Sequence, residues 1–333
     1  MFLDDKVDII IPVYNAVTCV KQCVSSIYEH ISHRINKVIL FDDASSEESF
    51  EAIKTLDYPN METYRSDRNY GYGQTVNKAF EKTETNLVLV LNSDVVAESD
   101  FLSPLVDAMN KDRRLGAIHP VPESSDKYAG YKDNNGFVIT HQLSGYAYLI
   151  RKDVFINAGM FDAVYGRGYF EDTALARDIA DLGWATGLHR KSILSHVGSS
   201  SFTKSEISEL YESNEKIYRE RYPESCRRVL ILSKYKSIDD LSGKAKSLIE
   251  NTTVKGGRVF FASNEIRDLP NYGIRGMSYA FLPLLSLIYR TFIRGWRRPY
   301  TRTTDVFIEE GNKGVLVWMV CFYARRYGVT IHR

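Results

Sequence analysis

The first 120 residues alternate short apolar runs with amphipathic helical patterns, and this alternation constrains the fold more than any other feature of the chain. The run VDIIIPV is followed by a segment with apolar residues at helical spacing, and then by a second run, KVILFDD. Such alternation is typical of parallel strands joined by crossover helices. The sequence therefore predicts an α/β fold with an open, mostly parallel sheet flanked by helices.

The same pattern continues along the chain. It predicts helices over 17–31, 47–56 and 74–82, strands at METYRS and LVLVL, and later a strand GYAYLIR, a short helix from Lys152, a helix EDTALARDIADLG and a strand SILSHV. Beyond residue 203 the composition becomes polar and then basic and aromatic, which favours a helical extension. We expect a catalytic domain over 1–203 and a mainly helical C-terminal extension over 204–333. Residues 122–142 read as a long loop, which we interpret as a flap over a donor or an acceptor.

Charge is unevenly distributed. The chain of 333 residues has a net charge of +1, but residues 251–333 carry 13 Lys/Arg against 5 Asp/Glu. Two segments, 277–300 and 314–328, combine apolar and aromatic residues with arginines. This composition favours contact with an anionic membrane surface. Packing on the core is the alternative, and binding of a nucleic-acid backbone is a less favoured one.

The start of the chain, MFLDDKVDIIIPVYN, has two acids before its apolar run and no small-residue cleavage site, so we expect no signal peptide. We therefore expect a cytoplasmic protein, which could also associate with the inner face of the membrane. No apolar stretch reaches the roughly 18 residues of a membrane span. The four cysteines lack the spacing of a zinc site, and we expect buried free thiols.

Acidic residues follow the predicted strands where a ligand would bind. In open α/β sheets, ligands occupy the crevice at the carboxyl ends of the strands. The sequence places Asp42, Asp43 and Asp94 at such ends. Because carboxylates that converge repel one another, we expect a cation or hydrogen-bond donors among them. A metal ion or a nucleotide is the natural counterpart.

Five motifs, PVYN, FDDAS, RNYGYGQTVNKAF, LNSDVV and GYFEDTALARDIADLGW, resemble those of glycosyltransferase family 2, in the same order. The resemblance covers residues 7–202. It implies a GT-A fold, a Rossmann-like nucleotide-binding domain, and inverting transfer of a sugar from a nucleoside diphosphate to a hydroxyl group. It also implies donor contacts from the first four motifs, namely Pro12, Tyr14, Asn15, Asp42, Asp43, Arg68, Asn69, Gly71, Asn77, Asn92 and Ser93. A plain turn at PVYN and a helix cap at FDDAS are the structural alternatives.

The metal site follows from the same resemblance. LNSDVV stands where the family has Asp-x-Asp, whose oxygens hold Mn²⁺ or Mg²⁺ against the donor diphosphate. Asp94 keeps the second acid, whereas Asn92 replaces the first. SHVGSSSF resembles the His-x-x-Gly-x-Ser of members in which a histidine completes the site, so His196 would be the second ligand. A structural histidine is the alternative.

Asp172 in FEDTALARDIADLGW corresponds to the family's general base, which takes the proton from the acceptor hydroxyl. Glu171 would orient the acceptor, and a helix-capping acid is the alternative. The motifs favour UDP- or dTDP-linked donors, including rhamnosyl donors. The acceptor would be a glycan or a lipid-linked glycan, and the pathway bacterial surface glycan or polysaccharide synthesis.

Two other functions stay open. Asn92, Ala174 and Asp178 depart from the family pattern, and a nucleotide-sugar-binding module that has lost catalysis would show such changes. A glycosyltransferase that acts on nucleic acid is the other. A nucleotidyltransferase is disfavoured, because PVYNAV stands where a phosphate loop rich in glycine and lysine would lie.

Overall fold

The computed structural model describes most of the chain and divides it into two compact units. The described residues are 6–122, 128, 130–198, 204–263, 266, 268–278, 302–309, 311–312 and 314–333. The first unit comprises Met1–Asp126, Asn134–Phe137 and Gln142–Tyr218, and the second comprises Lys127–Asp133, Val138–His141 and Arg219–Arg333. Each unit has its own sheet and its own core, as separate folding units do.

In the described part of the first unit, eight strands form one sheet in the order β3-β2-β1-β4-β8-β6-β9-β7. The strands are β1 (Val7–Val13), β2 (Ile35–Asp42), β3 (Met61–Arg65), β4 (Leu87–Leu91), β6 (Leu115–Val121), β7 (Phe137–Ile139), β8 (Ala147–Arg151) and β9 (Ala185–Ile193). A short pair, β5 (Val95–Val96) and β10 (Ser195–His196), lies outside it. Since β1 pairs in parallel with β2 and β4 while β8 is antiparallel, the sheet is mostly parallel. The predicted open α/β sheet is therefore confirmed.

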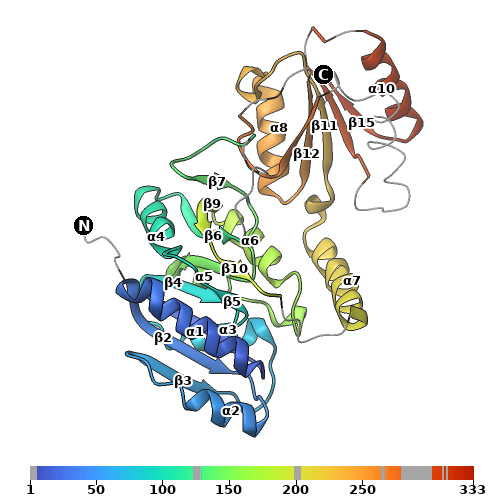
Figure 1. The fold of residues 1–333 in the computed structure, drawn as a ribbon. Helices are drawn as coiled ribbons and strands as arrows, with labels where there is room; N and C mark the ends of the chain where they lie inside the picture. The colour runs from blue at the N-terminus through green and yellow to red at the C-terminus, as the bar shows by residue number, and fades with distance from the viewer. Residues whose placement is uncertain are drawn as a thin grey trace. The chain divides into compact units, whose positions relative to one another are not determined.

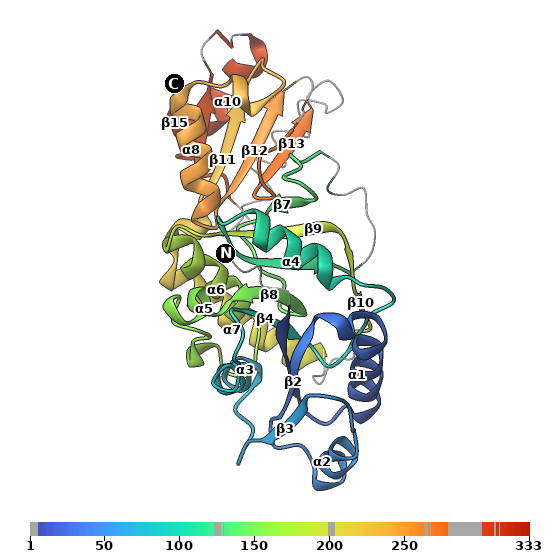
Figure 2. The ribbon, with the colours of Figure 1, turned by 90° about the vertical axis from the view of Figure 1, so that its left-hand side faces the viewer.

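Helices cover both faces of this sheet. They are α1 (Val17–Ile31), α2 (Glu47–Lys54), α3 (Tyr72–Phe80), α4 (Leu102–Lys111), α5 (Lys152–Asn157) and α6 (Glu171–Asp181), and α7 (Lys204–Arg221) follows them along the chain. Figures 1 and 2 show α1 and α4 on one face and α3, α5 and α6 on the other. Single-turn helices of the 3-10 type occur at Ser32–Arg34, Ala163–Tyr165, Pro223–Cys226 and Ile238–Asp240. The helices predicted over 17–31, 47–56 and 74–82 are thus confirmed to within two residues at each end.

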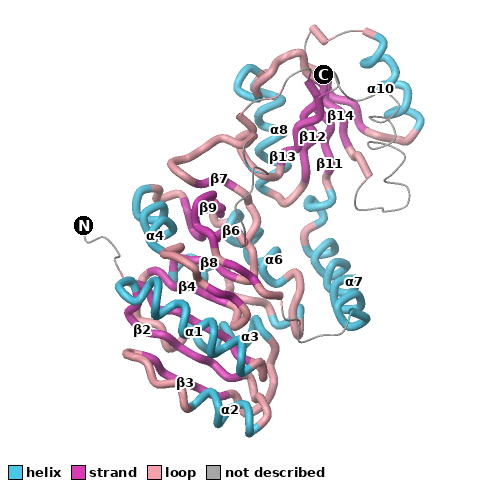
Figure 3. The backbone as a smooth tube through the Cα atoms, in the orientation of Figure 1, coloured by secondary structure: helices cyan, strands magenta, loops and turns pink. Residues whose placement is uncertain are grey.

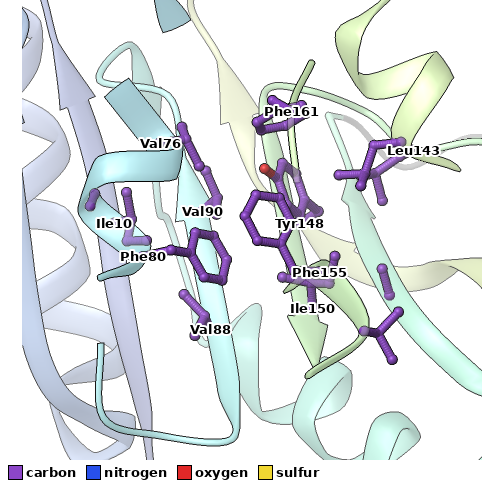
Figure 4. Packing of buried hydrophobic residues seen from close by; sticks show 14 of the residues in the cluster. Ile10, Val76, Phe80, Val88, Val90, Leu143, Tyr148, Ile150, Phe155 and Phe161 are labelled. Atoms are coloured by element: carbon purple, nitrogen blue, oxygen red, sulfur yellow. The ribbon is translucent and has the colours of Figure 1, made fainter. Parts of the chain in front are cut away.

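The core beneath α3, α5 and α6 is built from branched and aromatic side chains (Figure 4). The rings of Phe80 and Phe155 stack with their centroids 3.9 Å apart, and Phe161 meets Phe155 edge to face. Tyr148 is fully buried beside them. Because protein interiors are packed as densely as organic crystals, this cluster fixes the positions of the helices that carry the loops at the carboxyl edge of the sheet.

The C-terminal extension is not mainly helical, contrary to the prediction from its composition. Among its described residues, five parallel strands form a sheet in the order β13-β12-β11-β14-β15. Figure 3 shows this sheet between two helices. The elements are β11 (Arg228–Leu232), α8 (Gly243–Val254), β12 (Arg258–Ser263), β13 (Ile274–Ser278), β14 (Asp305–Ile308), α10 (Val315–Arg326) and β15 (Thr330–His332).

The physical reason lies in the burial of these strands on both faces. RVLIL, RVFFAS and DVFI show no alternation of polar and apolar residues, because α8 covers one face and α10 the other. Short continuous apolar runs cannot be told from buried helix by periodicity alone. The abundance of arginine and tyrosine around these runs favoured the wrong assignment.

Two other sequence expectations meet the structure only in part. The loop over 122–142 contains β7, and its segments 127–133 and 138–141 cluster with the second unit, where Tyr131 bridges Leu269 and Ile139 bridges Asn271. Its assignment as a flap stays a prediction. Segment 277–300 lies outside the described residues except for its first two. In the part of the chain that the structure describes, no helix is long and apolar enough to cross a bilayer. None of the four cysteines forms a disulfide, as predicted, but only Cys23 and Cys321 are buried, whereas Cys19 and Cys226 are partly exposed.

We expect Phe155→Ala to lower the free energy of unfolding of the first unit by about 3–5 kcal/mol, because it empties the space between α3 and α5. The neighbouring Ile156 is half exposed, so Ile156→Ala should change stability by no more than about 0.5 kcal/mol. Urea unfolding followed by circular dichroism measures both values. Equal losses in the two variants would contradict the packing described above.

Candidate functional site

The loops that follow β1 and β2 are tied to each other at the carboxyl edge of the sheet. The Asn15 backbone N–H donates to Ser45 Oγ at 2.6 Å, and Asn15 Oδ1 accepts from the Ser46 backbone N–H at 3.0 Å. Asn15 has a φ of 59°, in the left-handed region that asparagine tolerates better than most residues. Pro12 lies within β1, and Tyr14 is 40% exposed just beyond it. Of the three predicted PVYN contacts, Tyr14 is thus open to a ligand, whereas the Asn15 side chain holds the two loops together.

Asp42 is a buried carboxylate at the end of β2. Its Oδ2 accepts from the Ser45 backbone N–H at 3.2 Å and lies 3.3 Å from Arg65 Nε. Its Oδ1 is buried without a hydrogen-bond partner among the described residues. Burial raises the pKa of this carboxyl, although Ser45 and Arg65 oppose the rise. A buried acceptor without a partner costs free energy, so a ligand N–H that reached it would be strongly favoured.

Asp43 has a different role in the structure. Its Oδ1 accepts from the Tyr70 backbone N–H and its Oδ2 from the Gly71 backbone N–H, both at 2.9 Å. Both carboxylate oxygens therefore hold the glycine-rich loop against the end of β2. Its predicted contact with the nucleotide stays a prediction.

Gly71 is the residue that lets this loop approach the chain before α6. Its φ is 83°, and a Cβ built there would lie 2.7 Å from the backbone oxygen of Gly166. Only glycine fits such a position. The predicted donor contacts Arg68 and Asn69 are exposed at the start of the loop, and the Arg68 guanidinium lies over the Tyr70 ring, 4.7 Å from its centroid.

Asn77 lies farther along, in α3, and its amide is engaged by the protein. Asn77 Nδ2 donates to the Phe161 backbone oxygen at 2.8 Å, and the Phe161 N–H donates to Asn77 Oδ1 at 3.0 Å. This paired contact places Phe161 in the core. A contact between Asn77 and a nucleotide stays a prediction.

Asp94 and His196 come together from segments a hundred residues apart. Asn92, Ser93 and Asp94 follow β4, and all three are partly exposed. Antiparallel pairing of β5 with β10 sets His196 opposite Val95. As a result His196 Nε2 lies 3.2 Å from Asp94 Oδ1, with the imidazole one-third exposed and the carboxylate 12% exposed.

This pair suits a divalent cation that is also held by a ligand. Two atoms that bind one ion at right angles, each about 2.1 Å away, are about 3 Å apart, close to the distance between His196 Nε2 and Asp94 Oδ1. Among the described residues, no group of three or more His, Cys, Asp or Glu side chains could enclose a metal. One carboxylate and one imidazole leave most coordination positions to other oxygens, as a diphosphate and water would supply.

Asp172 lies in the first turn of α6, and hydrogen bonds hold its carboxylate. Asp172 Oδ2 accepts from the Gly145 backbone N–H at 3.0 Å, and Oδ1 accepts from the Thr173 backbone N–H at 2.6 Å and from the Thr173 hydroxyl at 3.2 Å. A carboxylate that accepts several N–H and O–H bonds is stabilised in its ionised form. A Cβ at Gly145 would lie 3.0 Å from Asp172 Oδ2, so a larger residue there would press on the Asp172 carboxylate.

Glu171, next to it, has the opposite environment. Its Oε2 is buried without a hydrogen-bond partner among the residues described. Burial raises the pKa of Glu171, and the charge of Asp172 raises it further. Burial also raises the pKa of Asp172, but the bonds from Thr173 and Gly145 oppose the rise. The two adjacent acids have unlike surroundings, and the hydrogen bonds at Asp172 make Glu171 the better holder of a proton.

Gly145 and Tyr146 connect the two parts of the site. Because β8 runs antiparallel to β4, its start lies beside the end of β4, and the Asn92 backbone N–H donates to the Tyr146 oxygen at 2.8 Å. The Tyr146 ring stacks on His196 with centroids 5.1 Å apart. Its neighbour Gly145 holds Asp172. One dipeptide thus contacts both the predicted base and the predicted metal pair.

The sequence interpretation missed several residues that organise this site. They include Gly145, Tyr146, Arg65 and Tyr72, whose hydroxyl donates to the Gly145 oxygen at 2.8 Å. A glycine directly before an apolar strand was a detectable sign of close approach. The pairing of Arg65 with Asp42 had no signal, because it depends on the register of β2 against β3.

The geometry agrees with what comparison with known proteins shows. Residues 8–172 match the sequence profile described as glycosyl transferase family 2. Glycosyltransferase GlyA of Streptococcus pneumoniae is 24% identical over 166 residues, which are 50% of this chain and 22% of that protein. The chain thus spans about a fifth of the length of this relative.

Solved structures show the same fold. A structure of GalNAc-T7 with UDP, GalNAc and Mn²⁺ superposes with a TM-score of 0.51 at 15% identity, over 57% of this chain and 43% of that one. The mostly parallel sheet flanked by helices is the GT-A arrangement that the motifs implied. With the profile match and five motifs in order along one edge of that sheet, the chain belongs to glycosyl transferase family 2, a family of transferase enzymes.

Proposed function

We propose that this chain is an inverting glycosyltransferase that transfers a sugar from a UDP- or dTDP-linked donor to a hydroxyl group. The donor would lie along the carboxyl ends of β1, β2 and β4. There Asp42 Oδ1, a buried acceptor without a partner among the described residues, would accept the N3–H of a uracil or thymine ring. Tyr14, exposed beside it, offers a face for the base or ribose. The acceptor would be a glycan or lipid-linked glycan in bacterial surface polysaccharide synthesis.

Asp94 and His196 would hold Mn²⁺ or Mg²⁺ on the donor side of the site. When bound, such an ion neutralises the charge that builds up on the departing diphosphate. The Tyr146 ring fixes the plane of the His196 imidazole, and the backbone pairing of β5 with β10 fixes the position of His196 next to Asp94. Both ligands are thereby held in place before a donor arrives.

Asp172 would take the proton from the acceptor hydroxyl as that oxygen attacks the anomeric carbon. Its three hydrogen bonds favour the ionised form, which a base requires. Glu171, with its raised pKa, can stay protonated and donate to an acceptor oxygen. A single displacement of this kind inverts the anomeric configuration.

The observation that carries the proposal is the shared contact through Gly145 and Tyr146. A base and a cation site on different faces of the molecule could not act on one glycosidic bond. Here Gly145, whose N–H donates a hydrogen bond to Asp172, is followed directly by Tyr146, whose ring stacks on His196. A carboxylate whose hydrogen bonds favour its ionised form, close to a partly exposed Asp–His pair, is the arrangement that metal-assisted glycosyl transfer needs.

The second unit offers a surface for an anionic membrane, which we propose as a further partner. In α10, Val315, Trp318 and Phe322 are more than half exposed and lie at helical spacing. Arg325 and Arg326 end the helix. A cavity of about 890 Å³ beside them is lined by Trp318, Phe322 and both arginines, among others. Aromatic residues that insert at the interface, next to cations that meet headgroups, are typical of interfacial helices.

Two variants should separate the chemical step from donor binding. Asp172→Asn should lower kcat by about 10² to 10⁴-fold while Mn²⁺-dependent UDP binding is retained, because the base acts only on the acceptor. His196→Ala should weaken Mn²⁺-dependent UDP binding by at least about tenfold. Transfer from a panel of UDP- and dTDP-sugars gives kcat, calorimetry gives binding, and NMR of the product gives its anomeric configuration.

Asp153 is the matched control, because it is also an acid in the first turn of a helix, but it is exposed and its Oδ1 accepts from the Val154 N–H within α5. Asp153→Asn should leave both readouts unchanged. Near-parental turnover in Asp172→Asn would remove Asp172 as the base. A product that retains the anomeric configuration would contradict direct displacement, and absence of both transfer and donor hydrolysis would favour a binding module.

The raised pKa of Glu171 predicts a pH-dependent stability. A carboxyl group whose pKa is higher in the folded state favours folding fully below its unfolded pKa, and this contribution is lost as pH rises through the folded pKa. Glu171→Gln should therefore raise Tm by at least about 2 °C at about pH 9 and leave it unchanged at about pH 4. Differential scanning calorimetry without metal or nucleotide measures this. An equal shift at both pH values would contradict burial of the charge as the cause.

Membrane contact is tested by flotation with vesicles. We expect the parent chain to bind vesicles that contain phosphatidylglycerol and not vesicles of phosphatidylcholine alone. Because both the rings and the charges contribute, Trp318→Ser with Phe322→Ser, and separately Arg325→Gln with Arg326→Gln, should each weaken binding by about tenfold or more. Binding that is unchanged in both double variants would exclude α10 as the lipid contact.

A further inference from the structure

The segment directly before α6 is held in a conformation that its own residues do not favour. Tyr169 and Phe170 have φ values of 71° and 72°, in the left-handed region where bulky side chains are strained. These two residues set the direction in which α6 begins, and Asp172 lies in its first turn. Contacts from elsewhere must therefore hold this segment, Tyr165–Phe170, in place.

Asn214 of α7 supplies such contacts. Its Nδ2 donates to the backbone oxygens of Tyr165 and Gly168 at 2.8 Å and of Tyr169 at 3.0 Å. The side chain is buried, with 4% of Asn214 exposed. Because all three partners are carbonyl oxygens, only the amide nitrogen can face them, and its two hydrogens are shared among the three. One side chain thus gathers the turn that leads into α6.

Neighbouring residues on the same face of α7 support this contact. Tyr211 and Tyr218 lie three residues before and four after Asn214, and both rings meet Phe170, with centroids 5.0 and 5.4 Å apart. On the other side of the turn, Gly71 packs against the Gly166 oxygen. The Tyr165–Phe170 segment is therefore clasped between α7 and the glycine-rich loop.

We propose that Asn214 is a positioning residue for the general base, a role that rests on the proposed function. It acts through the backbone of Tyr165, Gly168 and Tyr169 and touches neither substrate nor metal. By fixing the left-handed pair before α6, it fixes the position of Asp172 relative to the acceptor. A displacement of a catalytic group by about 1 Å can cost about 10²-fold in rate. The donor-side residues Asp42, Asp94 and His196 contact other elements, and Asp43 holds the glycine-rich loop through the Tyr70 and Gly71 N–H groups, so donor binding should not depend on Asn214.

Asn214→Ala tests this role by removing the side-chain amide that donates the three hydrogen bonds. We expect kcat to fall by about 10 to 100-fold, while the KM for the donor and Mn²⁺-dependent UDP binding stay within about twofold of the parent. Hydrogen exchange of the amides of residues 166–172 should become at least about tenfold faster. If Asn214→Ala folds poorly, Tyr211→Leu is a milder change at an exposed ring. It should shift kcat and hydrogen exchange in the same direction. Ser213→Ala is the matched control, since Ser213 is exposed and its hydroxyl bonds only within α7.

A parental kcat in both Asn214→Ala and Tyr211→Leu would overturn the proposal. So would a loss of kcat matched by an equal loss of UDP binding, because that pattern indicates general destabilisation of the unit. If the parent chain transfers no sugar, the proposed function fails and the catalytic role of Asn214 fails with it. Unchanged exchange of residues 166–172 would instead show that Asn214 does not hold the segment, whatever the activity.

Discussion

Parallel pairing of β1 with β2 on one side and β4 on the other is the constraint on which the rest of the first unit depends. It aligns the ends of three strands at one edge, so the loops after Val13, Asp42 and Leu91 leave the sheet side by side. The antiparallel strand β8 then brings its own start, with Gly145 and Tyr146, to the same edge. Without this register, the candidate site residues, from Tyr14 to His196 along the chain, would not meet at one surface.

The acids at this edge are separated by what each one contacts. Asp43 uses both oxygens on the backbone of the glycine-rich loop, which makes it a structural residue of the site. Asp42 keeps one oxygen without a partner among the residues described, and Asp94 meets an imidazole. This division avoids repulsion between neighbouring charges, because each carboxylate is compensated by different groups. It also leaves Asp94 beside His196 for the proposed cation site, although the chain lacks the first acid of Asp-x-Asp.

Asp172 and Glu171 show how two adjacent acids acquire different chemistry. The peptide N–H groups of Gly145 and Thr173 and the Thr173 hydroxyl stabilise the charge on Asp172. Burial and the charge of Asp172 raise the pKa of Glu171, whose Oε2 has no hydrogen-bond partner among the described residues. The segment that presents both acids depends on α7, a helix whose sequence reads as a charged surface helix. Asn214 is buried between Tyr211 and Tyr218 on its one packed face, and a spacing of three and four residues among charged neighbours was the only sequence sign of it.

The sequence by itself determined the sheet type, the helices and strands of the first 200 residues, and which residues follow each strand, because apolar periodicity and order along the chain carry that information. The sequence did not predict the C-terminal sheet, because strands buried on both faces lack the alternation of polar and apolar residues. Only the tertiary structure decided which side chains are engaged by the protein itself. Asn15, Asp43 and Asn77 are polar residues of the expected motifs, yet their side chains form hydrogen bonds with backbone groups distant in sequence. Hydrogen bonds between residues far apart follow from strand register and helix packing, and no local pattern encodes the partner.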